Sequence, residues 1–107
     1  MPVKTADQQS ALSVHRVRQG VIKDRTSWIN RLRGLLAEFG IVMPEGRYTV
    51  QAAIPGILGD GGNRLPSLAR KVIHDLWLSI QQANDQILSY DRALARQCRD
   101  DETSPFD

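Results

Sequence analysis

The sequence predicts an all-α fold, an elongated antiparallel hairpin of two long helices whose connector holds one short helix. Apolar residues recur every three or four positions over 5–40 and again over 66–99, and prolines and glycines interrupt the segment between them. At about 1.5 Å per residue, each long helix would reach roughly 50 Å. We therefore expect the 107 residues to form a single, elongated helical domain over 1–107.

The first helix is expected over 5–40. Thr5 and Gln8 have the spacing of a capping box, in which each side chain bonds to the backbone of the other residue. Gly40 stands where a left-handed residue ends a helix. The weak point is Gly20, which costs about 1 kcal/mol relative to alanine in a helix interior, so the sequence allows a kink or break there. The apolar stripe runs through Ala11, Val14, Val21, Trp28, Leu32, Leu35 and Phe39, with Arg18 and Arg25 inside it.

The connector is expected over 41–65. Its first residues, 41–43, should fold back against the end of the first helix. A short helix is predicted near 48–54, stopped by Pro55 and Gly56. The glycine-rich run 59–63 is predicted to be a hinge, because it lacks the lysine and hydroxyl residue of a phosphate-binding loop.

The second helix is expected over 66–99, with Pro66 in its first turn. Its apolar residues alternate steps of four and three, the pattern of a coiled-coil seam. The acidic residues 100–102 and the Ser104-Pro105 pair predict a tail over 100–107. The seam runs through Ala69, Ile73, Leu76, Ile80, Ala83, Ile87, Tyr90 and Leu94.

A two-helix hairpin leaves part of each apolar stripe in water, and Trp77, Leu78 and Leu88 lie off the seam. We therefore expect a homodimer, either a coiled coil or a four-helix arrangement of two hairpins, of undetermined orientation. In the alternative, these side chains pack under the connector within one chain. The residues predicted for the core or dimer seam are Ile73, Leu76, Trp77, Ile80, Ile87 and Leu94.

Composition excludes several classes of protein. No apolar run approaches the roughly 18 residues of a membrane span, so no membrane partner is expected. The single Cys98 cannot form an internal disulfide, and the amino terminus lacks the apolar core of a signal peptide. A cytoplasmic location is predicted. His15 and His74 have no further ligand at metal-binding spacing, so we expect no metal, no cofactor and no catalytic residue.

Charge is unevenly distributed along the chain. Residues 1–64 hold nine Lys/Arg and five Asp/Glu, a balance of +4, whereas 65–107 hold five and seven, a balance of −2. Arginines inside an apolar stripe need partners, which could be Asp75, Asp85 or Asp91 in this chain, or a surface outside it. The candidate contacts to nucleic acid or to another domain are His15, Arg16, Arg18, Lys23, Arg25, Arg31 and Arg33.

A family resemblance rests on one long motif. The pattern Arg-Thr-x3-Asn-x2-Arg-x2-Leu-x-Glu-x-Gly-Ile over 25–41, preceded by His15-Arg16-Val17-Arg18 and Lys23-Asp24 and followed by Pro44-Glu45-Gly46, resembles the DEDD-type insertion-sequence transposases. The likeness extends from about Val3 to about Arg99. Members of that family have an RuvC-like amino-terminal domain and a carboxy-terminal domain with a nucleophilic serine. The matched region looks like the dimer-forming coiled-coil segment between these domains.

The resemblance implies a non-catalytic part of a larger enzyme. The acidic tetrad and the serine of the family match no residue of this chain, which we expect to be a piece of a longer chain or a truncated gene product. The leading hypothesis is a dimerisation and linker fragment of an enzyme of DNA transposition and recombination, associated with the nucleoid when bound to DNA. Its partners would be the missing RuvC-like and serine domains, and DNA with a guide RNA in some relatives.

Two alternatives remain open on the sequence. In the first, the chain is a nucleic-acid-binding helical module that contacts DNA or guide RNA through the basic first helix, with His15, Arg18, Arg25, Thr26 and Arg33 on one contiguous side. In the second, it is a helical adaptor that captures a partner helix on Trp77 and Leu78.

Overall fold

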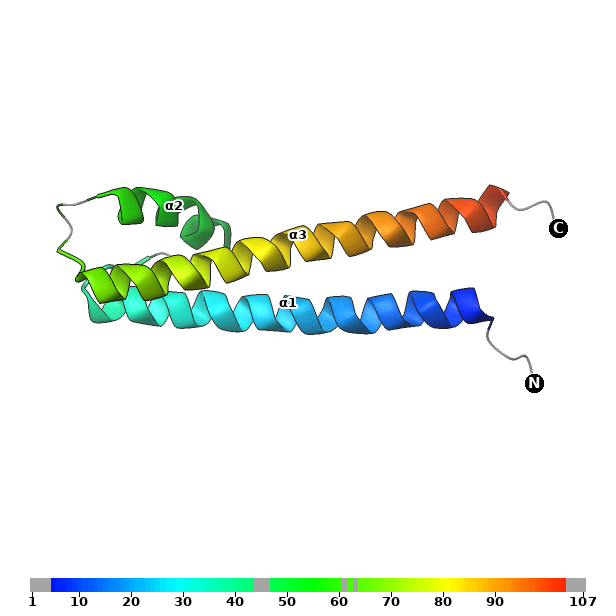
Figure 1. Cartoon of the computed structure of the whole chain (residues 1–107), viewed down its shortest axis with the longest axis horizontal. Helices are drawn as coiled ribbons and strands as arrows, with labels where there is room; N and C mark the ends of the chain where they lie inside the picture. The colour runs from blue at the N-terminus through cyan, green and yellow to red at the C-terminus, as the bar shows by residue number, and fades with distance from the viewer. Residues whose placement is uncertain (1–4, 44–46, 61, 63, 104–107) are drawn as a thin grey trace.

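The computed structural model describes residues 5–43, 47–60, 62 and 64–103, and it confirms the predicted all-α hairpin. Three helices follow one another: α1 (Ala6–Glu38), α2 (Arg47–Gly59) and α3 (Ser67–Thr103). α1 and α3 lie antiparallel, and α2 packs beside them at the connector end (Figure 1). The described residues contain no strand. The molecule measures 64 × 25 × 22 Å and its radius of gyration is 19.4 Å, against about 13 Å for a compact chain of this length.

Both ends of α1 are closed as the sequence predicts. The Gln8 amide donates to Thr5 Oγ1 at 3.1 Å, and the Thr5 amide donates to Gln8 Oε1 at 3.0 Å. At the other end Gly40 has a φ of +80°, and the Ile41 amide donates to the Leu36 carbonyl at 2.9 Å. This is the left-handed cap that favours glycine. Gly20 causes no break, because α1 is continuous from Ala6 to Glu38.

The short helix is longer than predicted. Pro55 and Gly56 were expected to stop it, but α2 runs from Arg47 to Gly59 with Pro55 inside. A proline removes one backbone hydrogen bond, a loss that packing can offset when apolar residues on both sides face a core. Ile54 is fully buried, and Ile57 and Leu58 are half-buried against the core, so α2 keeps its apolar face on both sides of the proline.

Arg70 of α3 ties the end of α2 in place. Its Nη1 donates to the Leu58 carbonyl at 2.8 Å, and its Nη2 donates to the Asp60 carbonyl at 2.7 Å. The last carbonyls of a helix have no intrahelical donor, so a guanidinium there satisfies acceptors that otherwise need water. Within the predicted hinge over 59–63, the Asp60 carbonyl is therefore bound by Arg70 of α3. Gly61 and Asn63 lie outside the described residues.

α3 is a single continuous helix of 37 residues. It runs from Ser67 to Thr103, so the acidic residues 100–102, predicted to begin a tail, belong to the helix. Ser104 and Pro105 lie outside the described residues. No described helix is both long enough and apolar enough to cross a membrane.

The core occupies the half of the hairpin next to the connector. The core is formed by residues of α1, α2 and α3 together with Leu65. Ile41 and Met43 fold back onto it as predicted, whereas Val42 is 82% exposed. In the described open half, α1 has no buried residue before Arg25 and α3 has none after Ile87. The buried apolar residues of the cluster are Ile29, Leu32, Leu36, Val50, Ile54, Leu65, Ile73 and Ile80.

Candidate functional site

The two arginines inside the apolar stripe of α1 face α3. Arg18 Nε donates to Asp91 Oδ1 at 2.7 Å, an ion pair whose side chains are 28% and 47% exposed. Asp91 is one of the three aspartates considered as partners, so for Arg18 the structure shows the intrachain alternative. Of the other two, Asp75 accepts from Lys71 Nζ at 2.9 Å, and Asp85 is exposed.

Arg25 is the one buried charged residue among those described, with 9% of its surface exposed. Its Nη1 donates to Asn84 Oδ1 of α3 at 2.9 Å, and Asn84 Nδ2 donates to Gln51 Oε1 of α2. Arg25 thus has an amide partner on α3, which the three candidate aspartates did not include. Because the amide both accepts and donates, these three side chains connect all three helices at the level where α2 meets the hairpin.

The predicted basic contacts do not gather on one surface. Arg16, Lys23 and Arg31 are exposed on the outer side of α1, as expected for its solvated face, whereas Arg33 is half-buried. His15 is exposed and lines a hollow between the open ends of α1 and α3, together with Gln8, Ala11, Leu94, Ala95, Gln97 and Cys98. The first helix therefore divides its basic residues between solvent and the interior of the hairpin.

The predicted seam of α3 is filled within the chain. Ile73, Ile80 and Ile87 are buried, and Leu76, Trp77 and Leu94 are half-buried. Trp77 packs against the cluster that contains Val50 and Ile54, which is the intrachain alternative. The seam is therefore core, because α1 and α2 cover it, while Leu78 and Leu88 remain 43% and 48% exposed.

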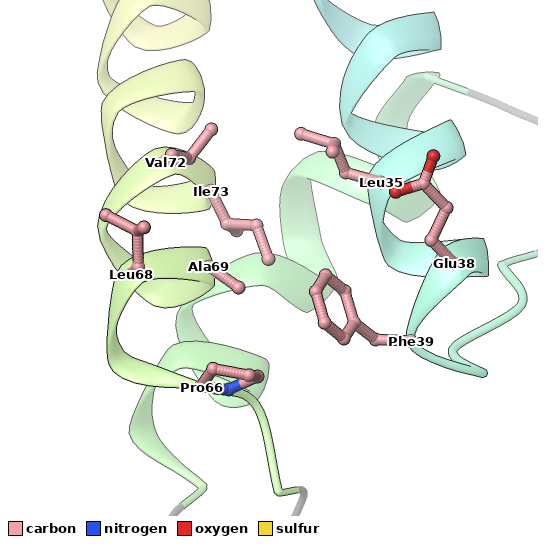
Figure 2. A pocket seen from close by; sticks show the side chains of 8 residues that line it. All are labelled: Leu35, Glu38, Phe39, Pro66, Leu68, Ala69, Val72 and Ile73. Carbon is pink, nitrogen blue, oxygen red and sulfur yellow. The ribbon is translucent and has the colours of Figure 1, made fainter.

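An apolar groove lies at the connector end, between the last turn of α1 and the first turns of α3 (Figure 2). Its volume is about 330 Å³, and Glu38 is its one charged lining residue. Phe39 and Leu35 point toward α3, and Ala69 and Ile73 point back toward α1. Leu68, Val72 and Phe39 are 74%, 42% and 41% exposed, so this apolar surface meets water. Sequence reasoning missed Leu68 and Val72 because both lie off the seam, although their spacing of four residues places them on one face.

The described residues contain no group of His, Cys, Asp or Glu side chains that could hold a metal ion. Some of their polar side chains join helices to one another, as Arg18, Arg25 and Arg70 do. At the groove, apolar side chains from the end of α1 and the start of α3 converge and stay partly exposed.

The sequence of this chain is similar to those of several bacterial proteins. The chain is 36% identical to a Sinorhizobium fredii protein named as a transposase, y4pF/y4sB. The match covers 104 residues, or 97% of this chain. This chain is also 30% identical over 91 residues to the transposase for insertion sequence element IS1111A of Coxiella burnetii, and 30% identical over 103 residues to that for IS1328 of Yersinia enterocolitica. The chain is similar to transposases. The predicted resemblance is confirmed at that level.

The likeness to these transposases covers nearly all of this chain and a minor part of each relative. It spans 97%, 85% and 94% of this chain but only 26%, 25% and 29% of the relatives. No protein-family model matches the sequence, and no solved structure is significantly similar. The chain thus spans between a quarter and three-tenths of the length of these transposases.

Proposed function

We propose that this chain is the helical connector of a DEDD-type DNA transposase, placed between the RuvC-like and the serine-containing domains. It performs no catalytic step and holds two copies of the enzyme together for DNA transposition and recombination. The observation that carries the proposal is the similarity of nearly the whole chain to a minor part of named transposases. The chain's architecture supports it, since a hairpin 64 Å long can span between two domains.

The apolar groove supports self-association. Leu68, 74% exposed, stands at the rim of a groove of about 330 Å³ on the same face. A protruding apolar side chain beside an apolar hollow is self-complementary, because a two-fold axis places each Leu68 in the groove of the other copy. Such an interface would bury Phe39 and Val72 as well, which removes exposed apolar surface from α1 and α3 together. We therefore propose the groove as the interface of the expected homodimer, in place of the off-seam residues Trp77, Leu78 and Leu88.

A chimera of the Coxiella burnetii IS1111A transposase tests the connector role. The segment of that enzyme matching this chain is replaced by residues 5–103, and excision of a marked insertion sequence is measured in cells. We expect the chimera to excise, and the same chimera with Leu68→Glu to lose excision. The matched control, Leu78→Glu, places the same charge at a 43% exposed leucine outside the groove and should retain excision. Equal excision with an unrelated helical hairpin in that position would contradict the proposal.

A further inference from the structure

The described end of α3 carries three exposed arginines that the transposase similarity and the groove leave unexplained. Arg92, Arg96 and Arg99, here called the arginine stripe, follow at steps of four and three, so they share one face of the helix. Together with Ser89 and Ala95 they line a shallow hollow of about 590 Å³. None of the three takes part in an ion pair with another described residue.

From this surface we infer that the arginine stripe binds the phosphate backbone of a nucleic-acid duplex. Over the seven residues from Arg92 to Arg99 the helix rises about 10.5 Å. Successive phosphates of one strand advance by about 3.4 Å along a duplex, so the stripe matches about three of them in length. Each guanidinium offers a planar fork of donors that fits phosphate oxygens, and the Ser89 hydroxyl adds a further donor in the same hollow.

Helix stabilisation does not account for the stripe. Cations near a helix carboxy terminus interact favourably with its dipole, which covers Arg99, but this effect is confined to the last turn, and Arg92 lies eleven residues before Thr103. Like charges at spacings of three and four cost a few tenths of a kcal/mol per pair, so Arg92, Arg96 and Arg99 weaken the helix they stand on. A polyanion lying along the stripe relieves that repulsion.

Acidic residues close to the stripe in the sequence would repel an anionic ligand. Asp85 is exposed two turns before Arg92, and Asp91 is already paired with Arg18. The acidic residues 100–102 follow Arg99 directly in the sequence. A ligand with a dense row of negative charge, as a duplex has, competes with these carboxylates better than an isolated anion does. The stripe is independent of the groove, and a failure to dimerise leaves this inference unchanged.

The test is fluorescence anisotropy of a labelled DNA duplex of about 20 base pairs, titrated with the chain at several salt concentrations from about 50 mM. Replacing the stripe by R92Q/R96Q/R99Q should lower the affinity about tenfold or more and reduce the slope of log affinity against log salt by about 2 to 3. The matched control R16Q/K23Q/R31Q removes the same charge from exposed residues of α1 and should change the affinity by about twofold at most. Circular dichroism verifies that both variants remain helical.

Three results would overturn the inference. No binding by the unmodified chain at about 50 mM salt excludes a phosphate contact. An equal loss in the stripe and α1 variants shows a general effect of net charge. Competition by polyglutamate as effective as that by unlabelled duplex assigns the stripe to an acidic protein surface. Conversely, neutralising residues 100–102 to the corresponding amides should tighten duplex binding, because it removes three negative charges next to Arg99.

Discussion

Arg25 of α1 and Asn84 of α3 are joined by a 2.9 Å hydrogen bond inside the apolar seam of the hairpin, and Asn84 passes a second hydrogen bond to Gln51 of α2. An apolar seam alone tolerates several relative positions of two long helices, because leucine and isoleucine fill neighbouring sites almost equally well. A buried polar contact fits only one register, since any shift leaves a guanidinium or an amide without its partner. We regard this contact as the feature that aligns the three helices.

Arg25→Ala should lower the free energy of unfolding by about 2 to 3 kcal/mol, because it removes a buried side chain and leaves the Asn84 oxygen without its donor. In a double-mutant cycle with Asn84→Ala, the coupling should be about 1 kcal/mol. Urea denaturation followed by circular dichroism measures both. Arg16→Ala, at an exposed position of the same helix, is the matched control and should change stability by less than about 0.5 kcal/mol. A coupling of zero would remove the register role.

The Arg18–Asp91 pair should contribute much less to stability. Its side chains are 28% and 47% exposed, so water and salt screen the charges. We expect Arg18→Gln and Asp91→Asn each to cost less than about 1 kcal/mol, and the cost to shrink in about 1 M salt. Denaturation at low and high salt tests this. A cost above about 2 kcal/mol that salt does not reduce would mean that the pair is more buried than the structure shows.

Gly40 and Gly20 should respond in opposite directions to alanine. Gly40 has a φ of +80° and nothing lies within 4 Å of an added Cβ, so the backbone alone makes Gly40→Ala unfavourable, by about 1 kcal/mol. Gly20 lies in the middle of α1 with open space around it, so Gly20→Ala should stabilise by about 0.5 to 1 kcal/mol. Thermal melts of the two variants provide the comparison. A loss of stability in Gly20→Ala would indicate that this glycine serves an interface.

Hydrogen exchange should differ between the two halves of the hairpin. The buried residues lie between positions 25 and 87, whereas in the open half α1 and α3 are joined by the Arg18–Asp91 pair and by a 2.9 Å hydrogen bond from Gln97 Nε2 to the Asp7 carbonyl. Few buried apolar contacts mean a low free energy of local opening. Amides of 29–36 and 73–87 should therefore exchange slowest, and those of 6–20 and 90–99 markedly faster. Uniform protection along both helices would contradict this division.

Features set by local chemistry could be predicted from the sequence. The capping box of Thr5 and Gln8, the left-handed Gly40 and the periodicity of α1 and α3 depend on nearby residues, and each was found as predicted. The extent of α2 could not be predicted, because a proline normally stops a helix and the packing that offsets it comes from α1 and α3, distant in sequence.

Features set by distant pairing were predicted only in part. The sequence offered three aspartates to Arg18 and Arg25 without a register to choose between them; the hairpin brings Asp91 to Arg18 and Asn84 to Arg25. The arginine stripe was not predicted, because the charge balance of −2 over residues 65–107 averages its three arginines with seven acidic residues. The apolar groove could not be predicted either, because it forms only where the end of α1 meets the start of α3.

That two copies of the chain join through the apolar groove is our main claim, and sedimentation equilibrium of the chain measures it. We expect a dimer at tens of micromolar that Leu68→Glu converts to a monomer of unchanged helicity, while Leu78→Glu remains dimeric. A dimer that survives Leu68→Glu would place the interface outside the groove. A chain that is monomeric and fully helical at these concentrations would contradict the claim itself.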